Sequence, residues 1–240
     1  MELDTLNIDE LLKQGIDFLK QFQLKDAENC FLKVLEKDGD NETAKKGMML
    51  QSLYTGFEEF EGPIVNLLKN QDQYDPNEYI VKISELSNNL VKATERACSF
   101  YEDIVFLYDL IAMRGVFYES RFKGSKNIDY CNLAGLYFSF TCSWHTGAQD
   151  VDKDILAELE RTRDRAGFFL DCNEKMKTGE CNLTWDEILD DENLYCRGLL
   201  RKEDDGKYSY FVPVARERST PIIREFGVLQ SIGQARIAQI

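Results

Sequence analysis

The 240-residue chain has little of several features that would point directly to a function. It contains four prolines and one histidine, and no long uninterrupted apolar run. The most apolar stretch, residues 133–144, includes Ser139, Thr141 and Ser143. It is about a dozen residues long, whereas a helix that spans a bilayer needs about 20. The sequence therefore predicts no membrane-spanning segment, and the scarcity of proline favours long helices.

Positive charge is also scarce. The chain has 29 Lys and Arg against 43 Asp and Glu, which gives a formal net charge of −14. General binding to nucleic acid or to an anionic membrane surface depends on Lys and Arg, so this composition argues against both. The negative charge is unevenly distributed along the chain, because residues 197–240 hold eight Arg or Lys against five Asp or Glu and so carry a net positive charge.

Sequence signatures of catalysis are missing as well. No phosphate-binding loop, dinucleotide fingerprint or nucleophile elbow occurs. The single histidine, His145, follows Cys142 by three positions, but no second pair has the spacing of a zinc site. We therefore expect no metal, no cofactor and no enzymatic activity. A hydrolase built on Cys142 and His145 is the weakest alternative.

The cysteines and the first residues of the chain bear on the cellular compartment in which the protein is expected. There are seven cysteines at irregular spacings, which is typical of reduced thiols rather than a disulfide framework. The first residues, MELDTLNIDELL, are acidic and resemble neither a signal peptide nor a transit peptide. We expect a cytoplasmic protein.

Residues 8–37 are predicted to form two antiparallel helices. Asn7 can cap the first helix, with Glu10 three positions later as its capping-box partner. A turn at Gln23 and Leu24 separates the helices, and the second ends near Gly39.

Small and aromatic residues give this hairpin a resemblance to a known family. Gly15 and Phe18 lie in the first helix, and Ala27 and Phe31 lie in the second. With these spacings, residues 8–41 resemble a tetratricopeptide repeat (TPR), a helix–turn–helix unit of about 34 residues. The resemblance implies a protein-binding module. No second clear repeat follows, so either degenerate repeats continue or a single hairpin packs on a long helix.

The resemblance also implies that a ligand would lie along the first helix. The matching groove-facing positions are Asp9, Leu12, Ile16, Leu19 and Lys20. A repeat that grips a terminal carboxylate uses Lys and Asn on this face, so a carboxylate clamp is not expected. The alternative is that these apolar residues pack against other helices of the same chain.

Residues 76–122 are predicted to form one continuous helix, about 70 Å long. Asp75 and Pro76 suit a helix start, and apolar or small residues then recur at steps of three and four from Ile83 to Phe122. Gly62 and Pro63 are predicted to interrupt the preceding helix. Such a long stripe could pair within the chain or with a second copy, which makes a homodimer possible.

The C-terminal part is predicted to contain a buried helix, an exposed helix and a β-hairpin. Residues 128–145 are apolar all round, which is typical of a buried helix. The next helix should run from Asp150 to near Gly179. One of its faces is expected to be solvated, because it carries the charged residues Glu158, Glu160, Arg161, Arg163, Asp164 and Arg165.

The end of the chain is predicted to hold shorter elements. Thr184 and Glu187 form a capping box for a helix to about residue 194. Asp205-Gly206 between two strand-like runs predicts a hairpin over residues 196–214, and Thr220 begins a weaker helix.

Cations surround this tyrosine-rich hairpin, at Arg197, Arg201, Lys202, Lys207, Arg216 and Arg218. Aromatic rings beside cations can hold single-stranded nucleic acid. The alternative function is therefore a nucleic-acid- or nucleotide-responsive regulator that binds anions through this hairpin. Otherwise these cations pair with acidic groups of the same or a neighbouring chain.

We predict a mainly α protein in three parts. Residues 1–60 form TPR-like helical hairpins, residues 61–180 form a bundle organised on the long helix, and residues 181–240 form a small α+β tail. The expected function is that of a non-catalytic adaptor or scaffold that binds another protein or a peptide.

Overall fold

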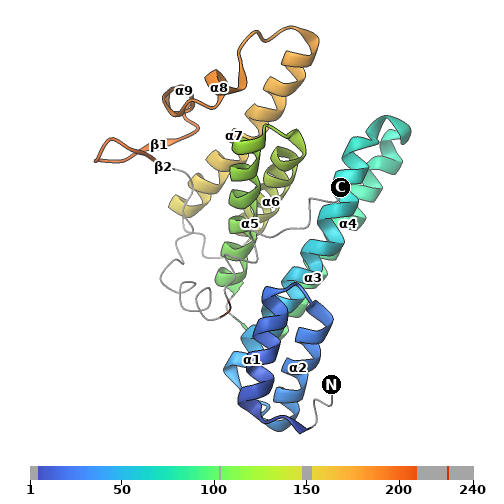
Figure 1. Cartoon of the computed structure of the whole chain (residues 1–240). Helices are drawn as coiled ribbons and strands as arrows, with labels where there is room; N and C mark the ends of the chain where they lie inside the picture. Colours follow the sequence, from blue (N-terminus) through green and yellow to red (C-terminus); the bar gives the residue numbers. More distant parts are fainter. Residues whose placement is uncertain (1–4, 103, 148–152, 210–225, 227–240) are drawn as a thin grey trace. The chain divides into compact units, whose positions relative to one another are not determined.

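The computed structural model describes residues 5–102, 104–147, 153–209 and 226 (Figure 1). These residues are mostly helical, with one two-stranded antiparallel sheet near the C-terminal end, which confirms the predicted fold class. The chain divides into two compact units. Unit 1 contains Met1–Leu107 and Glu217–Ile240, and unit 2 contains Tyr108–Arg216.

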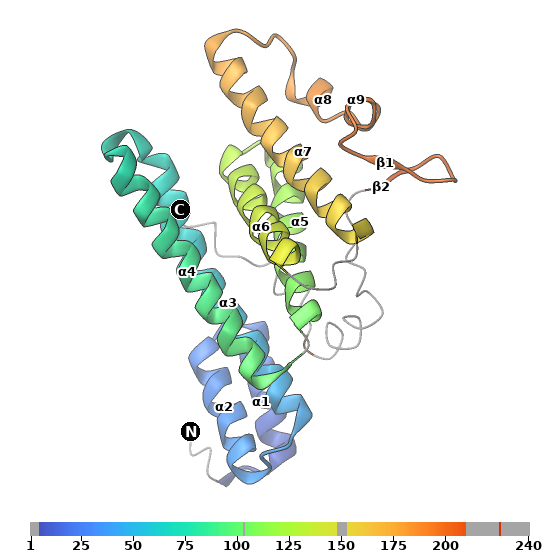
Figure 2. The ribbon, with the colours of Figure 1, turned by 180° about the vertical axis from the view of Figure 1, so that it is seen from behind.

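Unit 1 is a series of helices in which each packs against the next. They are α1 (Ile8–Lys20), α2 (Leu24–Lys37), α3 (Glu42–Lys69) and α4 (Pro76–Phe100), with a short 3-10 turn (Gln71–Gln73) between α3 and α4. Figures 1 and 2 both show consecutive helices side by side and antiparallel.

The two helices expected within residues 8–37 are confirmed. Their predicted capping box is also present, because the Glu10 amide donates to Asn7 Oδ1 and the Asn7 amide donates to Glu10 Oε2, both at 2.9 Å.

The aromatic ring of Phe31 lies where α1, α2 and α3 meet. Phe31 and Ala27 of α2 are fully buried. A Cβ atom built on Gly15 of α1 would lie 2.7 Å from the Phe31 ring, and one built on Gly47 of α3 would lie 2.5 Å from it. The lack of a side chain at Gly15 and Gly47 therefore allows the backbones of α1 and α3 to approach the Phe31 ring closely. The sequence pattern identified Gly15 and Phe31 but not Gly47.

The predicted break at Gly62 and Pro63 is wrong. Helix α3 continues through Pro63, whose side chain is exposed, while Phe60 and Ile64 on either side are buried. A proline costs a helix one backbone hydrogen bond, but packing of the flanking turns holds the helix together. The predicted domain limit at residue 60 therefore lies inside α3.

The single helix expected over residues 76–122 is also wrong. Asp75 and Pro76 do start α4 as predicted, but α4 ends at Phe100, where Tyr101 adopts an extended conformation. Helix α5 (Ile104–Ser125) then begins separately. Two helices that each bury one face can continue the same three-and-four spacing, because this spacing does not record where one helix ends and the next begins. A homodimer along one continuous helix therefore loses its structural basis.

Unit 2 is built around α5, α6 (Ile128–Gly147) and α7 (Lys153–Thr178). The burial predicted for α6 is confirmed by Leu133, Tyr137 and Phe138, which have no exposed surface. Tyr137 stacks on Tyr118 of α5 with ring centroids 6.0 Å apart, and Phe122 of α5 contacts Phe169 of α7 at 5.3 Å. Aromatic rings therefore fill the space among the three helices.

The end of unit 2 contains α8 (Trp185–Ile188), α9 (Asp191–Cys196), β1 (Arg201–Lys202) and β2 (Tyr208–Ser209). The capping box of Thr184 and Glu187 is confirmed. One helix to residue 194 was expected, but Asp190 caps a second helix instead.

The strands pair Arg201 with Ser209 and Lys202 with Tyr208, and Gly206 adopts the positive φ of 82° that the turn requires. The predicted hairpin is thus confirmed in its turn and in the pairing of residues 201–202 with 208–209, but its expected start at residue 196 is wrong, because Cys196 ends α9 and β1 begins only at Arg201. Residues 210–214 lie outside the described residues, as does the helix expected after Thr220, except at Phe226.

Replacing Gly15 with alanine should destabilise unit 1. The new methyl group would overlap the Phe31 ring, and overpacking of this kind costs about 1–3 kcal/mol. Gly167→Ala is the matched control, because nothing lies within 4 Å of a Cβ at this position of α7. Alanine there should stabilise the protein by about 0.5–1 kcal/mol through helix propensity. Urea unfolding followed by circular dichroism measures both changes, and a Gly15→Ala variant as stable as the parent would contradict the enclosure of Phe31.

Candidate protein-binding surface

The five predicted groove residues of α1 differ in exposure. Asp9 is exposed, whereas Leu12, Ile16 and Lys20 are half-buried. Leu19 has 1% of its surface exposed and belongs to the core of unit 1, so its assignment to a groove is wrong. Helical spacing places Leu19 on the same face as Leu12, but it does not reveal where along that face a neighbouring helix lies. The other four residues remain accessible at least in part.

A second accessible apolar surface lies at the start of α4. Ile80 and Val81 are 61% and 54% exposed, which is high for large aliphatic side chains. Within α4 the buried residues are Leu90, Thr94 and Ala97, all in its second half. Ile80 extends the apolar stripe of α4 by one more step of three residues before Ile83. An apolar residue on the stripe near a helix end was thus the available sequence signal, and our interpretation did not use it.

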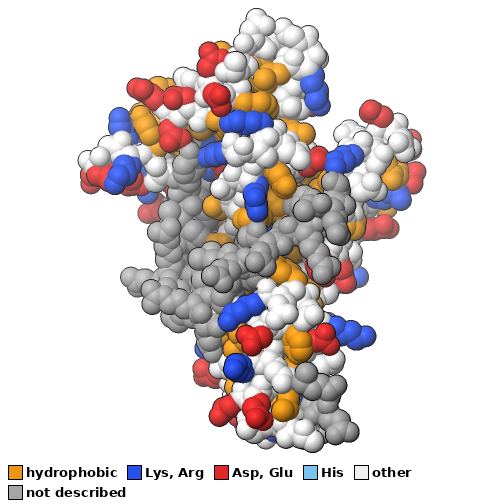
Figure 3. All heavy atoms as spheres, in the orientation of Figure 1, with side chains coloured by type: hydrophobic (Ala, Val, Ile, Leu, Met, Phe, Trp, Pro, Cys, Tyr) orange, Lys and Arg blue, Asp and Glu red, His pale blue; other side chains and the backbone are white. Residues whose placement is uncertain are grey.

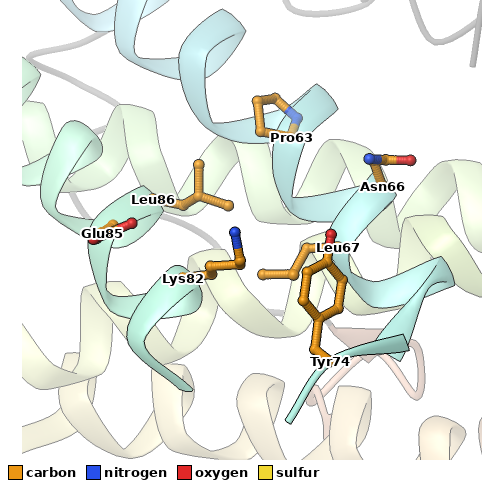
Figure 4. Close-up of a pocket in the computed structure, with 7 residues that line it drawn as sticks. All are labelled: Pro63, Asn66, Leu67, Tyr74, Lys82, Glu85 and Leu86. Atoms are coloured by element: carbon orange, nitrogen blue, oxygen red, sulfur yellow. The ribbon is translucent and has the colours of Figure 1, made fainter. Parts of the chain in front are cut away.

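A pocket of about 250 Å³ lies between the end of α3 and the start of α4 (Figure 4). Its lining is mixed aliphatic, aromatic and polar, and consists of Pro63, Asn66, Leu67, Tyr74, Lys82, Glu85 and Leu86. Lys82 Nζ lies 5.3 Å from the centroid of the Tyr74 ring and 3.6 Å from Glu78 Oε1. The wall of the pocket thus holds one cation, Lys82, and one carboxylate, Glu85.

The described cations of the predicted anion-binding cluster have partners within the chain. Arg201 Nε lies 3.6 Å from Glu158 Oε1, and Lys207 Nζ lies 2.7 Å from Asp205 Oδ2. The turn between the strands adds Glu203 and Asp204 beside Asp205. Among the described residues on the face shown in Figure 3, acidic and basic side chains are interspersed.

Arg197 and Lys202 lie over aromatic rings instead. The Arg197 guanidinium is 4.8 Å from the centroid of Phe168, and Lys202 Nζ is 5.3 Å from that of Tyr208 and 5.7 Å from that of Tyr195. The remaining two residues of the cluster, Arg216 and Arg218, lie outside the described residues.

Cys142 and His145 lie in the last turns of α6. His145 is 9% exposed, and its ring centroid is 5.4 Å from that of Tyr108. Burial raises the pKa of the Cys142 thiol to about 11, against a weaker opposing effect of Arg163. A thiol with this pKa is almost wholly protonated at neutral pH and is a poor nucleophile. Within the described ranges, no three His, Cys, Asp or Glu side chains gather as a metal site would require.

A buried charged cluster in unit 2 was missed by the sequence analysis. Arg165 was assigned to a solvated face of α7, but 1% of its surface is exposed. Its Nε and Nη2 atoms donate to the two carboxylate oxygens of Glu119 at 2.7 and 2.8 Å, and Nη1 donates to the Leu199 carbonyl oxygen at 2.8 Å. Lys123 Nζ lies 3.2 Å from Glu119 Oε1. These contacts tie α5 to α7 and to the segment after α9.

The cluster holds Glu119 in its charged form. Burial raises the pKa of this carboxyl group, but the charges and hydrogen bonds of Arg165 and Lys123 together lower it below its ordinary value of 4.5. A carboxyl group with a lowered pKa in the folded state stabilises that state above the pKa it has in the unfolded chain. This stabilisation is lost as the pH falls through the folded-state pKa.

Glu119→Leu should destabilise unit 2 by about 3–5 kcal/mol near pH 7, because it leaves the Arg165 charge buried without its carboxylate. The loss relative to the parent should shrink as the pH falls below 4.5 and through the lowered folded-state pKa of Glu119, where the parent also loses this charge. Glu36→Gln is the control, since it removes a surface pair with Lys33 and should cost less than about 1 kcal/mol. Urea unfolding at pH 7 and over a series of lower pH values measures these differences. Equal destabilisation by the two variants would contradict a buried charged cluster.

None of the helices within the described ranges is both long and apolar enough to cross a membrane. Comparison with protein-family models, with curated proteins and with solved structures gave no match to this chain.

Proposed function

We propose that this protein is a non-catalytic adaptor or scaffold that binds a protein or peptide along the first helix of a TPR-like hairpin. The observation that carries the proposal is the partial exposure of Leu12 and Ile16 on α1. They lie one helical turn apart, with Asp9 and Lys20 on the same face as charged neighbours. A partner that covers them gains the free energy of burying the rest of two aliphatic side chains.

An amphipathic segment is the partner chemistry that this face fits. Apolar anchors at helical spacing, flanked by one acidic and one basic residue, are complementary to a helix or extended peptide with apolar side chains and a mixed charged rim. The exposed pair Ile80 and Val81 supports the same class of function, because large aliphatic side chains left exposed are often found at interaction surfaces.

The alternative is a regulator that binds nucleic acid or a nucleotide through the hairpin of unit 2. Arg197 and Lys202 over aromatic rings favour this alternative. The pairing of Arg201 with Glu158 and of Lys207 with Asp205 favours the adaptor, because paired cations gain less from binding a polyanion.

We place the adaptor in the cytoplasm. All seven cysteines are free thiols, which fits a reducing compartment. The partner in this proposal is a different protein or peptide, and a homodimer is the other possibility.

Leu12→Glu with Ile16→Glu should weaken partner binding about 100-fold or more, because two charges would face an apolar contact, and a factor of 100 corresponds to about 2.8 kcal/mol. Lys13→Glu with Asp17→Glu is the matched control. It adds the same change in net charge to exposed positions of the same helix. Partners are first captured by the parent protein from nuclease-treated lysate and identified by mass spectrometry. Their affinities for the parent and both variants are then measured with purified components.

Selective loss of a partner in the Leu12/Ile16 variant, with an unchanged circular dichroism melting curve, is the expected result. Partners that disappear on nuclease treatment would favour the alternative function. Unfolding of the Leu12/Ile16 variant would show that this face belongs to the core, and the adaptor proposal would lose its basis.

A further inference from the structure

Phe226 lies in the core of unit 1, although it comes from the far end of the sequence. It is 1% exposed, and its ring meets that of Phe31 at 61° with centroids 6.4 Å apart. An edge-to-face arrangement at this distance is a favourable aromatic contact. Unit 2, Tyr108–Arg216, separates Phe226 in sequence from the helices that it joins.

The ring that Phe226 meets belongs to α2 and is enclosed by α1 and α3. The ring of Phe31 is confined by Gly15 and Gly47, where no added Cβ would fit. It therefore presents a fixed edge or face to any group that packs on it. The α1–α4 series is continuous and carries its own caps at Asn7, Asn41 and Asp75. Phe226 is thus an addition to a set of helices whose local structure is specified without it.

We propose that unit 1 contains a binding site for a phenylalanine side chain beside Phe31, and that the chain fills this site itself with Phe226. The ligand class is a short segment that carries one phenylalanine, and the occupant in this chain is Phe226. Attachment to the same chain raises the effective concentration of Phe226, so that even a modest contact remains occupied. A segment of another protein that presents phenylalanine in the same way would compete with it.

This site is separate from the α1 surface of the proposed function and does not depend on it. Leu12 and Ile16 are half-buried and accessible in part, whereas Phe31 is fully buried with Phe226 against it. The Phe226 site can therefore exist whether or not a partner binds α1.

The test uses the full-length chain and a fluorescently labelled peptide of residues 219–233. Its binding is measured by fluorescence anisotropy to the parent protein, to Phe226→Ala and to Phe168→Ala. Phe168→Ala is the matched control, because Phe168 is a half-buried phenylalanine of α7 in unit 2. A second peptide carries alanine at position 226. Hydrogen exchange of the full-length proteins reports on α2 and α3 directly.

The peptide should bind Phe226→Ala at least tenfold more tightly than the parent or Phe168→Ala, and the alanine peptide should bind at least tenfold more weakly. Exchange in α2 and α3 should rise in Phe226→Ala and return toward the parent level when the phenylalanine peptide is added. Equal binding to the parent and Phe226→Ala, or no binding to a folded Phe226→Ala chain, would overturn the proposal. Loss of the helices of unit 1 in Phe226→Ala would also overturn it, because Phe226 would then be an indispensable core residue.

Discussion

The close approach of two backbones to the Phe31 ring is the constraint on which unit 1 depends. Gly15 and Gly47 leave no room for a Cβ atom, so α1 and α3 are held at one separation and one rotation about α2. In this arrangement Leu19 faces the core while Leu12 and Ile16 stay partly accessible. The same ring is the one that Phe226 meets. The packing of α1 and α3 and the contact with Phe226 therefore centre on one aromatic ring.

The helices of unit 2 are joined by different interactions. Its helices are joined by aromatic rings and by Arg165, which places three of its hydrogen bonds on Glu119 of α5 and on the Leu199 carbonyl oxygen. A buried ion pair adds little stability compared with apolar packing of the same volume, but it penalises every arrangement in which one charge is left alone. We suggest that the cluster selects one register of α5 against α7.

Our proposal of a binding function rests on the surface of the described residues. Burial keeps the Cys142 thiol protonated, and Arg201 and Lys207 lie close to carboxylates of the same chain. The accessible apolar side chains include Leu12 and Ile16 on α1, and Ile80 and Val81 at the start of α4. In the proposal, another polypeptide covers the α1 pair, and experiment has to identify it.

The sequence by itself determined the elements whose signals are local. The caps at Asn7, Asp75 and Thr184, the two helices within residues 8–37 and the turn at Gly206 follow from contacts between residues a few positions apart. Only the tertiary structure decided that Pro63 is tolerated inside α3, that the apolar stripe over residues 76–122 is divided between two helices, and that Arg165 of α7 is buried. Each of these outcomes depends on partners that are distant in the chain. Helical spacing shows that a residue lies on a given face, but what covers that face is decided by the helix or side chain packed against it.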